Sequence, residues 1–182
     1  MPVPVDVQVP ILLKVLAFDR HTVEAREKPL VVGVLYQSGF RLSSSVRDEV
    51  MEALSRSGPG GPGNRTLKLV AIDAEKNDDL AEPLARREVN VLYVTPLRAF
   101  DLGRVVSATR RTGALSVTGV PEYVEAGLSI GIELRQDRPR ILVNLEAARA
   151  EGADLTAPEP IRIRLPGRIA RIAAAGVLTF AR

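Results

Sequence analysis

Four short apolar runs, separated by longer amphipathic segments, constrain the fold of this chain more than any other feature of its sequence. Continuous apolar runs of this length are typical of strands that are buried on both faces, as in a parallel sheet. Strands that alternate with helices indicate right-handed crossovers. The sequence therefore predicts an α/β fold, a single-domain three-layer sandwich with a mostly parallel sheet. The runs are Leu30–Tyr36, Leu67–Ile72, Val89–Thr95 and Ala114–Thr118.

Helices are expected before and between these strands. The first spans Val9–Asp19, is almost wholly apolar and should be well buried, with Pro10 in its first turn. The cluster Ser43–Ser45 should cap the second, where Ser45 and Asp48 resemble a capping box. Two more are predicted at Asp78–Arg87 and Leu97–Arg111, and Gly113 should end the latter as a C′ glycine.

The C-terminal third of the chain departs from this alternation. Leu128–Leu134 and Arg140–Asn144 flank Asp137 and predict an antiparallel hairpin, followed by a short helix at Leu145–Glu151. We expect one α/β domain over residues 1–155 and a Pro- and Arg-rich tail over 156–182, whose structure the sequence leaves open. In this tail Ile161–Leu165 alternates like a strand, and Arg168–Ala175 suggests a helical turn or two.

Composition excludes several classes of protein. The formal net charge is only +3 and aromatic residues make up 4% of the chain, so nucleic-acid binding is not expected. The absence of cysteine excludes disulfides, thiolate nucleophiles and cysteine-ligated zinc. No apolar stretch is long enough to insert into a membrane.

No catalytic constellation is visible in the sequence. His21 is the only histidine, and its place at the end of a helix favours a structural role. The glycine-rich segment 57–64 lacks the preceding strand and the Gly-Lys-Ser/Thr of a phosphate-binding loop. Asp73, Asp78 and Asp79 could bind Mg²⁺, but capping roles are favoured. We therefore predict no catalytic residue, metal or cofactor.

Polar side chains collect in the loops that follow three of the predicted strands. In open α/β sheets ligands bind at the carboxyl ends of strands, near the switch point of the topology. These loops could hold a small polar ligand or a peptide of a partner, or their hydroxyls could simply cap turns and helices. The candidate binding residues are Ser38, Ser43, Ser44, Thr95, Arg98, Thr118, Glu122 and Tyr123.

The second half of the chain is similar to the YfiR-like family. The strand Val91–Thr95 is followed by a helix and by the segment GALSVTGV, which begins at Gly113. A hairpin then ends in Asn144 and leads into an Ala-Ala-Arg helix. The resemblance covers residues 9–155, and the matching positions are Gly113, Thr118, Gly127, Gly131, Asn144, Leu145, Ala147, Ala148 and Arg149.

This resemblance implies a compact α/β sandwich in the periplasm that restrains cyclic-di-GMP synthesis. Its implied partner is a membrane-bound diguanylate cyclase or sensor kinase, and it also implies a homodimer. No signal peptide precedes Met1-Pro2-Val3, so a complete chain would be cytoplasmic. The family's closing apolar helix is replaced here by the Pro-rich segment 156–167. If that helix normally forms the dimer surface of the family, this chain lacks the surface. Two alternatives stay open: a ligand-binding domain like one lobe of a solute-binding protein, and an enzyme whose site no motif reveals.

Overall fold

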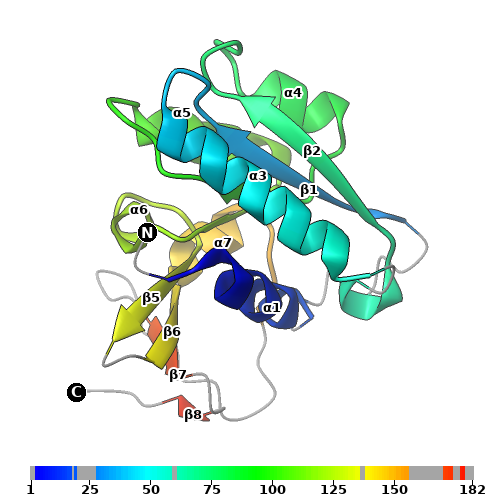
Figure 1. Cartoon of the computed structure of the whole chain (residues 1–182), viewed down its shortest axis with the longest axis vertical. Coiled ribbons are helices and arrows are strands. Elements are labelled where there is room, and N and C mark those ends of the chain that lie inside the picture. The colour runs from blue at the N-terminus through cyan, green and yellow to red at the C-terminus, as the bar shows by residue number, and fades with distance from the viewer. Residues whose placement is uncertain are drawn as a thin grey trace.

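A computed structural model describes residues 3–17, 19, 28–58, 61–135, 138–155, 170–173 and 177–178. Within these residues the chain forms one eight-stranded sheet in the order β2-β1-β3-β4-β5-β6-β7-β8 (Figure 1). The strands are β1 (Leu30–Tyr36), β2 (Leu67–Asp73), β3 (Val91–Val94), β4 (Leu115–Thr118), β5 (Ile130–Arg135), β6 (Arg138–Val143), β7 (Ala170–Ala173) and β8 (Val177–Leu178).

The sheet is parallel from β2 to β5 and antiparallel from β5 to β8. This arrangement confirms the predicted α/β class and the predicted hairpin, in which Ile132 lies opposite Ile141. The suggestion of a helical turn within Arg168–Ala175 is wrong, because Ala170–Ala173 pairs with β6 as a strand. Ile161–Leu165 and Asp137 lie outside the described residues.

Helices cover both faces of the sheet, as the three-layer prediction requires (Figure 1). Residues of α1 and α3 pack with Val32 and Tyr93 on one face, and residues of α4 and α5 pack with Leu35 and Leu92 on the other. Among the described residues, no helix is both long and apolar enough to cross a membrane. The helices are α1 (Val5–Leu16), α3 (Arg41–Arg56), the 3₁₀ helix η1 (Pro62–Asn64), α4 (Ala81–Arg86), α5 (Leu102–Thr112), α6 (Pro121–Glu125) and α7 (Leu145–Ala150).

The N-terminal helix differs from its prediction in place and in burial. It begins at Val5, so Pro10 lies in its interior and not in its first turn. Val9, Leu12 and Leu16 are buried, whereas Val7, Pro10 and Lys14 face solvent. The missing N–H of an interior proline costs a helix one hydrogen bond, and packing on the sheet offsets this loss.

The predicted capping box at Ser45 and Asp48 is also wrong. The helix α3 starts at Arg41, its N-cap is Phe40, and no side chain caps it. Ser43 lies inside the first turn, and its hydroxyl is hydrogen-bonded to Thr95. This tertiary contact cannot be predicted from the local sequence. In contrast, Gly113 ends α5 in the left-handed conformation with φ 70°, as predicted.

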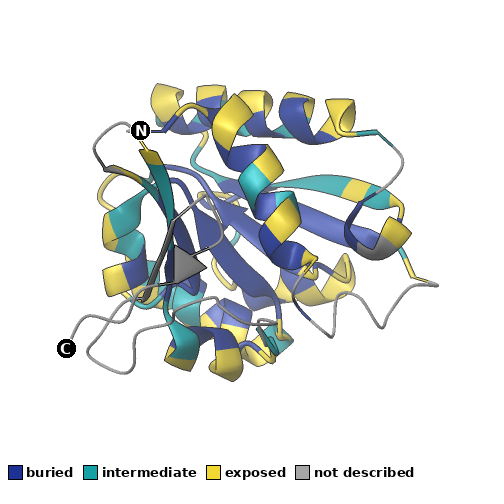
Figure 2. Ribbon diagram, turned by 90° about the horizontal axis from the view of Figure 1, so that it is seen from below, coloured by how far each residue is buried: buried dark blue, intermediate teal, exposed yellow. Residues whose placement is uncertain are grey.

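The order β2-β1-β3 sets where the chain reverses its direction across the sheet. From β1 the chain crosses to β2 on one side and then returns to β3 on the other. The topological switch point therefore lies between the carboxyl ends of β1 and β3. The strands at this point are buried on both faces (Figure 2), which fixes the loops that follow them on a rigid base.

Candidate functional site

The candidate site is the carboxyl edge of the sheet, where the loops after β1, β2, β3 and β4 meet. Ser43 of α3 and Thr95, which follows β3, lie in contact across the switch point. Thr95 Oγ1 donates to the Leu35 carbonyl oxygen at 2.9 Å, so Ser43 Oγ donates to Thr95 Oγ1 at 2.6 Å. Ser43 Oγ also accepts from the backbone N–H of Gln37 at 2.9 Å. Both buried hydroxyls are therefore used in joining β1, β3 and α3.

Thr118 and Tyr123, at and after the end of β4, also form hydrogen bonds within the domain. Thr118 Oγ1 donates to the Val94 carbonyl oxygen at 2.9 Å and accepts from Val120 N at 3.1 Å. The Tyr123 hydroxyl accepts from Leu97 N at 2.8 Å and donates to Leu97 O at 3.1 Å. Tyr123 belongs to α6, a short helix in a segment where the sequence had suggested only a loop.

Gln37 and Glu75 complete this edge, and the sequence analysis did not single out either residue. The Gln37 carboxamide accepts from Arg98 N at 2.8 Å and donates to Glu75 Oε1 at 3.1 Å. The other Glu75 oxygen accepts from Gly39 N at 2.6 Å and Ser38 Oγ at 2.8 Å. Gln37 follows directly after a predicted strand, and that position was the one signal that could have indicated it.

The two acids at the end of β2 are held in their charged forms. Hydrogen bonds from Gly39 N–H, the Ser38 hydroxyl and the Gln37 amide lower the pKa of Glu75. Burial by itself raises the pKa of Asp73, but hydrogen bonds from Glu75 N–H and from Ser38, with the nearby Lys76 ammonium, outweigh it, and the net pKa is lowered. The loop after β1 is therefore fastened to the loop after β2 by carboxylates.

The structure thus brings the eight candidates to one edge and divides them by role. Ser43, Thr95, Thr118 and Tyr123 are used inside the fold, and Ser38 is bonded to Glu75. Ser44 is half-buried in α3, and Arg98 and Glu122 have exposed side chains.

A cavity of about 510 Å³ lies at the opposite, amino edge of the sheet. Its wall contains three buried charged residues, Asp19, Arg65 and Glu151, and the more exposed Lys28, Glu88 and Asn90. Burial lowers the pKa of Arg65, although the nearby Asp19 acts in the opposite direction. The sequence analysis predicted no site at this edge, because ligands of such sheets usually bind at the carboxyl ends of strands.

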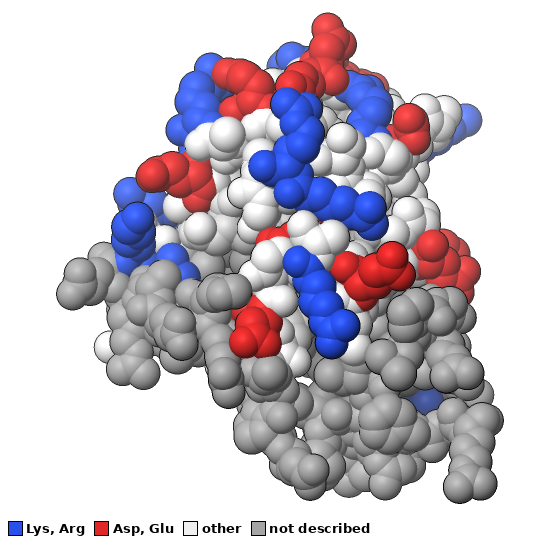
Figure 3. Space-filling model, turned by 180° about the vertical axis from the view of Figure 1, so that it is seen from behind, with Lys and Arg blue, Asp and Glu red and all other residues white. Residues whose placement is uncertain are grey.

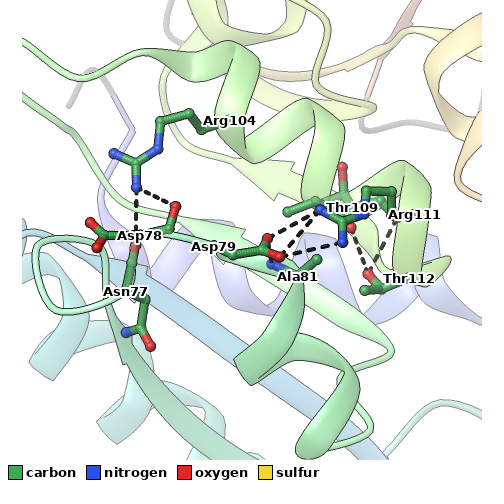
Figure 4. Close-up of polar contacts among 9 residues, drawn as sticks. Asn77, Asp78, Asp79, Ala81, Arg104, Thr109, Arg111 and Thr112 are labelled. Atoms are coloured by element: carbon green, nitrogen blue, oxygen red, sulfur yellow. Dashed lines mark hydrogen bonds and ion pairs between the residues drawn. The ribbon is translucent and has the colours of Figure 1, made fainter.

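A smaller hollow of about 350 Å³ lies between the loop before α4 and the helix α5. Figure 4 shows how this loop is fastened: Arg104 donates to the carbonyl oxygens of Asn77 and Asp78 at 3.0 and 2.9 Å. Arg111 pairs with Asp79 at 3.2 Å, and Asp79 also caps Ala81 N–H. Asp79 thus accepts from the first N–H of α4, in agreement with the capping role that the sequence favoured, whereas Asp78 takes part through its backbone carbonyl.

Surface charge and ligand groups give no sign of a nucleic-acid or metal site in the described part of the chain. Figure 3 shows basic and acidic side chains interspersed over the face seen from behind. No three acidic or histidine side chains of the described residues converge as metal ligands do. His21 lies outside the described residues.

One buried acid, Glu151, was also missed by the sequence analysis. It follows α7, and its carboxylate accepts from Thr109 Oγ1 at 2.6 Å, Ser116 N at 2.8 Å and Ser116 Oγ at 2.7 Å. Ser129 Oγ is a further donor. This carboxylate joins α5, β4 and the start of β5, and all its donors are internal.

The sheet order and the contacts at the carboxyl edge define a doubly wound α/β domain. Side chains of the domain itself, Ser43, Thr95 and Gln37, fill its switch point. The sequence matches the family described as YfiR/HmsC-like over residues 6–158, and the chain belongs to this family. The resemblance seen in the sequence is thereby confirmed. At the level of the family, this match supports a regulatory module of the periplasm.

The solved structures agree with the fold. A crystal structure of the ABC domain from Streptococcus pneumonia, in complex with L-Trp, superposes with a TM-score of 0.51 at 15% identity. The match covers 79% of this chain and 57% of that one, so the chain corresponds to little more than half of its structural neighbour. No curated protein matches the sequence.

Several of the positions that match the YfiR-like family determine the conformation of the backbone. Gly113 needs its positive φ to end α5, and a Cβ on Gly131 would overlap Val124 of α6. Asn144 caps α7 by accepting from Ala147 N at 3.1 Å. Thr118 holds β4 to β3. These matching positions therefore determine where helices begin and end and how β4 is joined to β3.

Proposed function

We propose that this chain is a non-enzymatic regulatory module of the periplasm. It binds a membrane-bound diguanylate cyclase or sensor kinase through protein contacts and restrains signalling by cyclic-di-GMP. The observation that carries this proposal is the family match over residues 6–158. The closed switch point supports it, because Ser43, Thr95 and Gln37 fill the crevice where domains of this fold bind small ligands.

Arg98 and Glu122 are the residues of the candidate set that we assign to partner contact. Their charged groups are exposed, and no ion pair within the described residues neutralises either one. Exposed charges at the rim of an interface act mainly on the rate of association and on the choice of partner. Ser38 and Ser44 belong to the same candidate set, although the Ser38 hydroxyl is bonded to Glu75.

A deletion strain tests this function directly. If the module restrains a cyclase, cellular cyclic-di-GMP, measured by mass spectrometry, rises when the gene is removed and returns when the wild-type gene is restored. The cyclase should also co-purify with the tagged chain from detergent-solubilised envelope. Unchanged cyclic-di-GMP in the deletion strain would count decisively against the proposal.

Restoring the gene with Arg98→Glu tests the assigned surface. This charge reversal should weaken association with the cyclase and leave cyclic-di-GMP raised, because it replaces an exposed cation of the assigned surface by a carboxylate. The matched control is Arg110→Glu, which makes the same change on an exposed residue of α5. Equal complementation by both variants would remove Arg98 from the interface.

A second candidate function is reception of a small ligand. The cavity of about 510 Å³ at the amino edge favours it, since pockets of this size hold small molecules. A ligand that binds only the folded chain raises its melting temperature. A thermal-shift screen of anions and metabolites, including the L-Trp of the pneumococcal domain, should reveal such a ligand, and a flat profile would speak against this function.

A further inference from the structure

The outer edge of β2 is open, and two hydrogen bonds fix which of its groups face outward. Thr66 O accepts from Leu30 N at 2.8 Å, and Ala74 N donates to Tyr36 O at 2.7 Å. Backbone groups of a strand point to alternate sides, so the even-numbered residues of β2 pair with β1. The odd-numbered residues, Leu69 and Ala71 in the middle of the strand, therefore point away from the sheet.

The outward groups of Leu69 and Ala71 have one partner among the described residues, whereas the Asp73 carbonyl oxygen at the end of the strand accepts from Asn77 Nδ2 at 2.7 Å. Arg87 Nη1 donates to the Ala71 carbonyl oxygen at 3.1 Å, which confirms the direction in which Ala71 points. β2 is the terminal strand of the sheet and pairs only with β1 within the described part of the chain. An edge of this kind is a template for another strand.

The side chains along this edge are apolar and incompletely covered. Leu67, Leu69, Val70 and Ala71 are each half-buried, whereas the residues of β1 and β3 beside them are buried. Figure 2 shows the same contrast between the teal β2 and the dark blue inner strands. An added strand would cover these side chains on both faces of the sheet at once.

The charge at this edge indicates what kind of strand would fit. Lys68 and Arg87 are exposed, and neither forms an ion pair with a carboxylate of the described residues. A second copy of the chain would bring like charges together across a symmetric β2–β2 junction, which opposes self-pairing. A strand with carboxylates at these positions would instead be attracted.

We propose that the outer edge of β2 receives an extended, acidic segment of the partner protein as an additional strand. Leu69 and Ala71 supply the main-chain hydrogen bonds, and Lys68 and Arg87 select for carboxylates. Arg87 leaves the Ala71 carbonyl when the segment arrives and so guards the edge in the free protein. This inference rests on the proposed function, since it names a second surface, besides that of Arg98 and Glu122, through which the same partner is held.

Ala71→Pro is the sharpest test, because proline removes an outward N–H and leaves the ladder between β1 and β2 intact. The control is Ala71→Val, which keeps the N–H and suits a strand. Binding of the purified chain to the cyclase's periplasmic domain is measured by calorimetry, and circular dichroism checks that each variant is folded. Ala71→Pro should weaken binding at least about tenfold, and Ala71→Val should not.

Lys68→Glu provides a test that leaves the backbone unchanged. It should weaken binding several-fold at low salt and less at high salt. Lys14→Glu makes the same charge change on the exposed face of α1 and should have no effect. If wild-type binds the cyclase and both Ala71→Pro and Lys68→Glu bind equally well, the edge proposal is overturned while the proposed function stands. If wild-type does not bind, both fail.

Amide hydrogen exchange locates the contact. In the complex the N–H groups of Leu69 and Ala71 should gain at least about tenfold protection, whereas Val70, already paired with β1, should change little. Protection confined to other elements would contradict the proposal. Sedimentation of the free chain as a dimer that Ala71→Pro dissolves would assign this edge to a second copy instead, and would overturn the acidic partner.

Discussion

Two glutamates, Glu151 and Glu75, accept similar sets of hydrogen bonds in opposite surroundings. Glu151 is 2% exposed and holds α5, β4 and β5 together. Glu75 is exposed and joins the loops after β1 and β2. The chemistry of the carboxylate is the same in both regions, so the difference between them isolates the effect of burial.

Burial decides what each set of hydrogen bonds contributes. Around Glu75 water can replace any lost bond, so these bonds choose a loop conformation more than they stabilise the fold. Glu151 is buried, so the Ser116 and Ser129 groups that donate to it are costly to leave without an acceptor. The comparison predicts a rigid region at α5–β4–β5 and an adjustable one at the carboxyl edge.

Glu151→Ala should produce the largest loss of stability. It leaves the hydroxyls of Ser116 and Ser129 and the Ser116 N–H without their acceptor, and each such group is costly to bury alone. Thr109 keeps its longer hydrogen bond to Val106 O at 3.2 Å. We expect the free energy of unfolding, from urea titration, to fall by roughly 3 kcal/mol or more.

Two variants delimit this effect. Glu151→Gln keeps one acceptor oxygen, and the hydroxyls can rotate to accept from its amide, so the loss should be about half as large. Glu125→Ala on the exposed surface of α6 should change stability by less than about 0.5 kcal/mol. An equal effect of Glu151→Ala and Glu125→Ala would refute the role of burial.

Tyr93→Phe tests a buried hydrogen bond between neutral groups. Its contribution to the free energy of unfolding should lie between those of Glu151 and Glu75. The Tyr93 hydroxyl donates to Gln8 Oε1 at 2.7 Å, and burial raises the pKa of this phenol. Removing the hydroxyl should lower the free energy of unfolding by about 1–1.5 kcal/mol, because one buried neutral hydrogen bond is lost. A loss as large as that of Glu151→Ala would show that charge adds nothing to the buried network.

Gly113→Ala separates backbone conformation from hydrogen bonding in the same region. A Cβ at this position would lie 3.7 Å from Glu151 O, an ordinary contact, so the φ of 70° is the main cost. We expect a loss of about 1 kcal/mol in urea unfolding. Leu102→Ala, at a half-buried position of the same helix, is the comparison without backbone strain. A Gly113→Ala variant as stable as wild-type would contradict the strain expected for alanine at this positive φ.

The sequence predicts the strands well because their signal is local. Leu30–Tyr36 matches β1 residue for residue, since a run of apolar residues between turns admits few other structures. Helix starts are predicted less well. Ser45 looks like part of a cap, but α3 starts earlier because Ser43 bonds Thr95, a partner 52 residues away. Such a contact has no signature in the local sequence.

The candidate site shows the same limit. Topology alone brings Ser38, Thr95 and Thr118 to one edge, and the sequence predicts this because parallel strands share their carboxyl ends. What these hydroxyls do there depends on neighbours that sequence cannot supply. Glu75 and Gln37 decide the geometry of the edge, and their contact with each other follows from the register of β1 against β2, which the sequence does not give.

Glu75→Gln should have the smallest effect on stability, yet the clearest effect on pH dependence. The pKa of Glu75 is lowered by folding, so its stabilising contribution is present above the unfolded pKa of about 4.3 and is lost as pH falls through the folded pKa. The urea midpoints of wild-type and Glu75→Gln should therefore differ slightly at pH 7 and converge as the pH falls below the unfolded pKa and through the lower folded one. At neutral pH the Gly39 amide should exchange faster in the variant, because its carboxylate acceptor is gone. A midpoint difference that is constant over this pH range would show that Glu75 acts through packing and not through its charge.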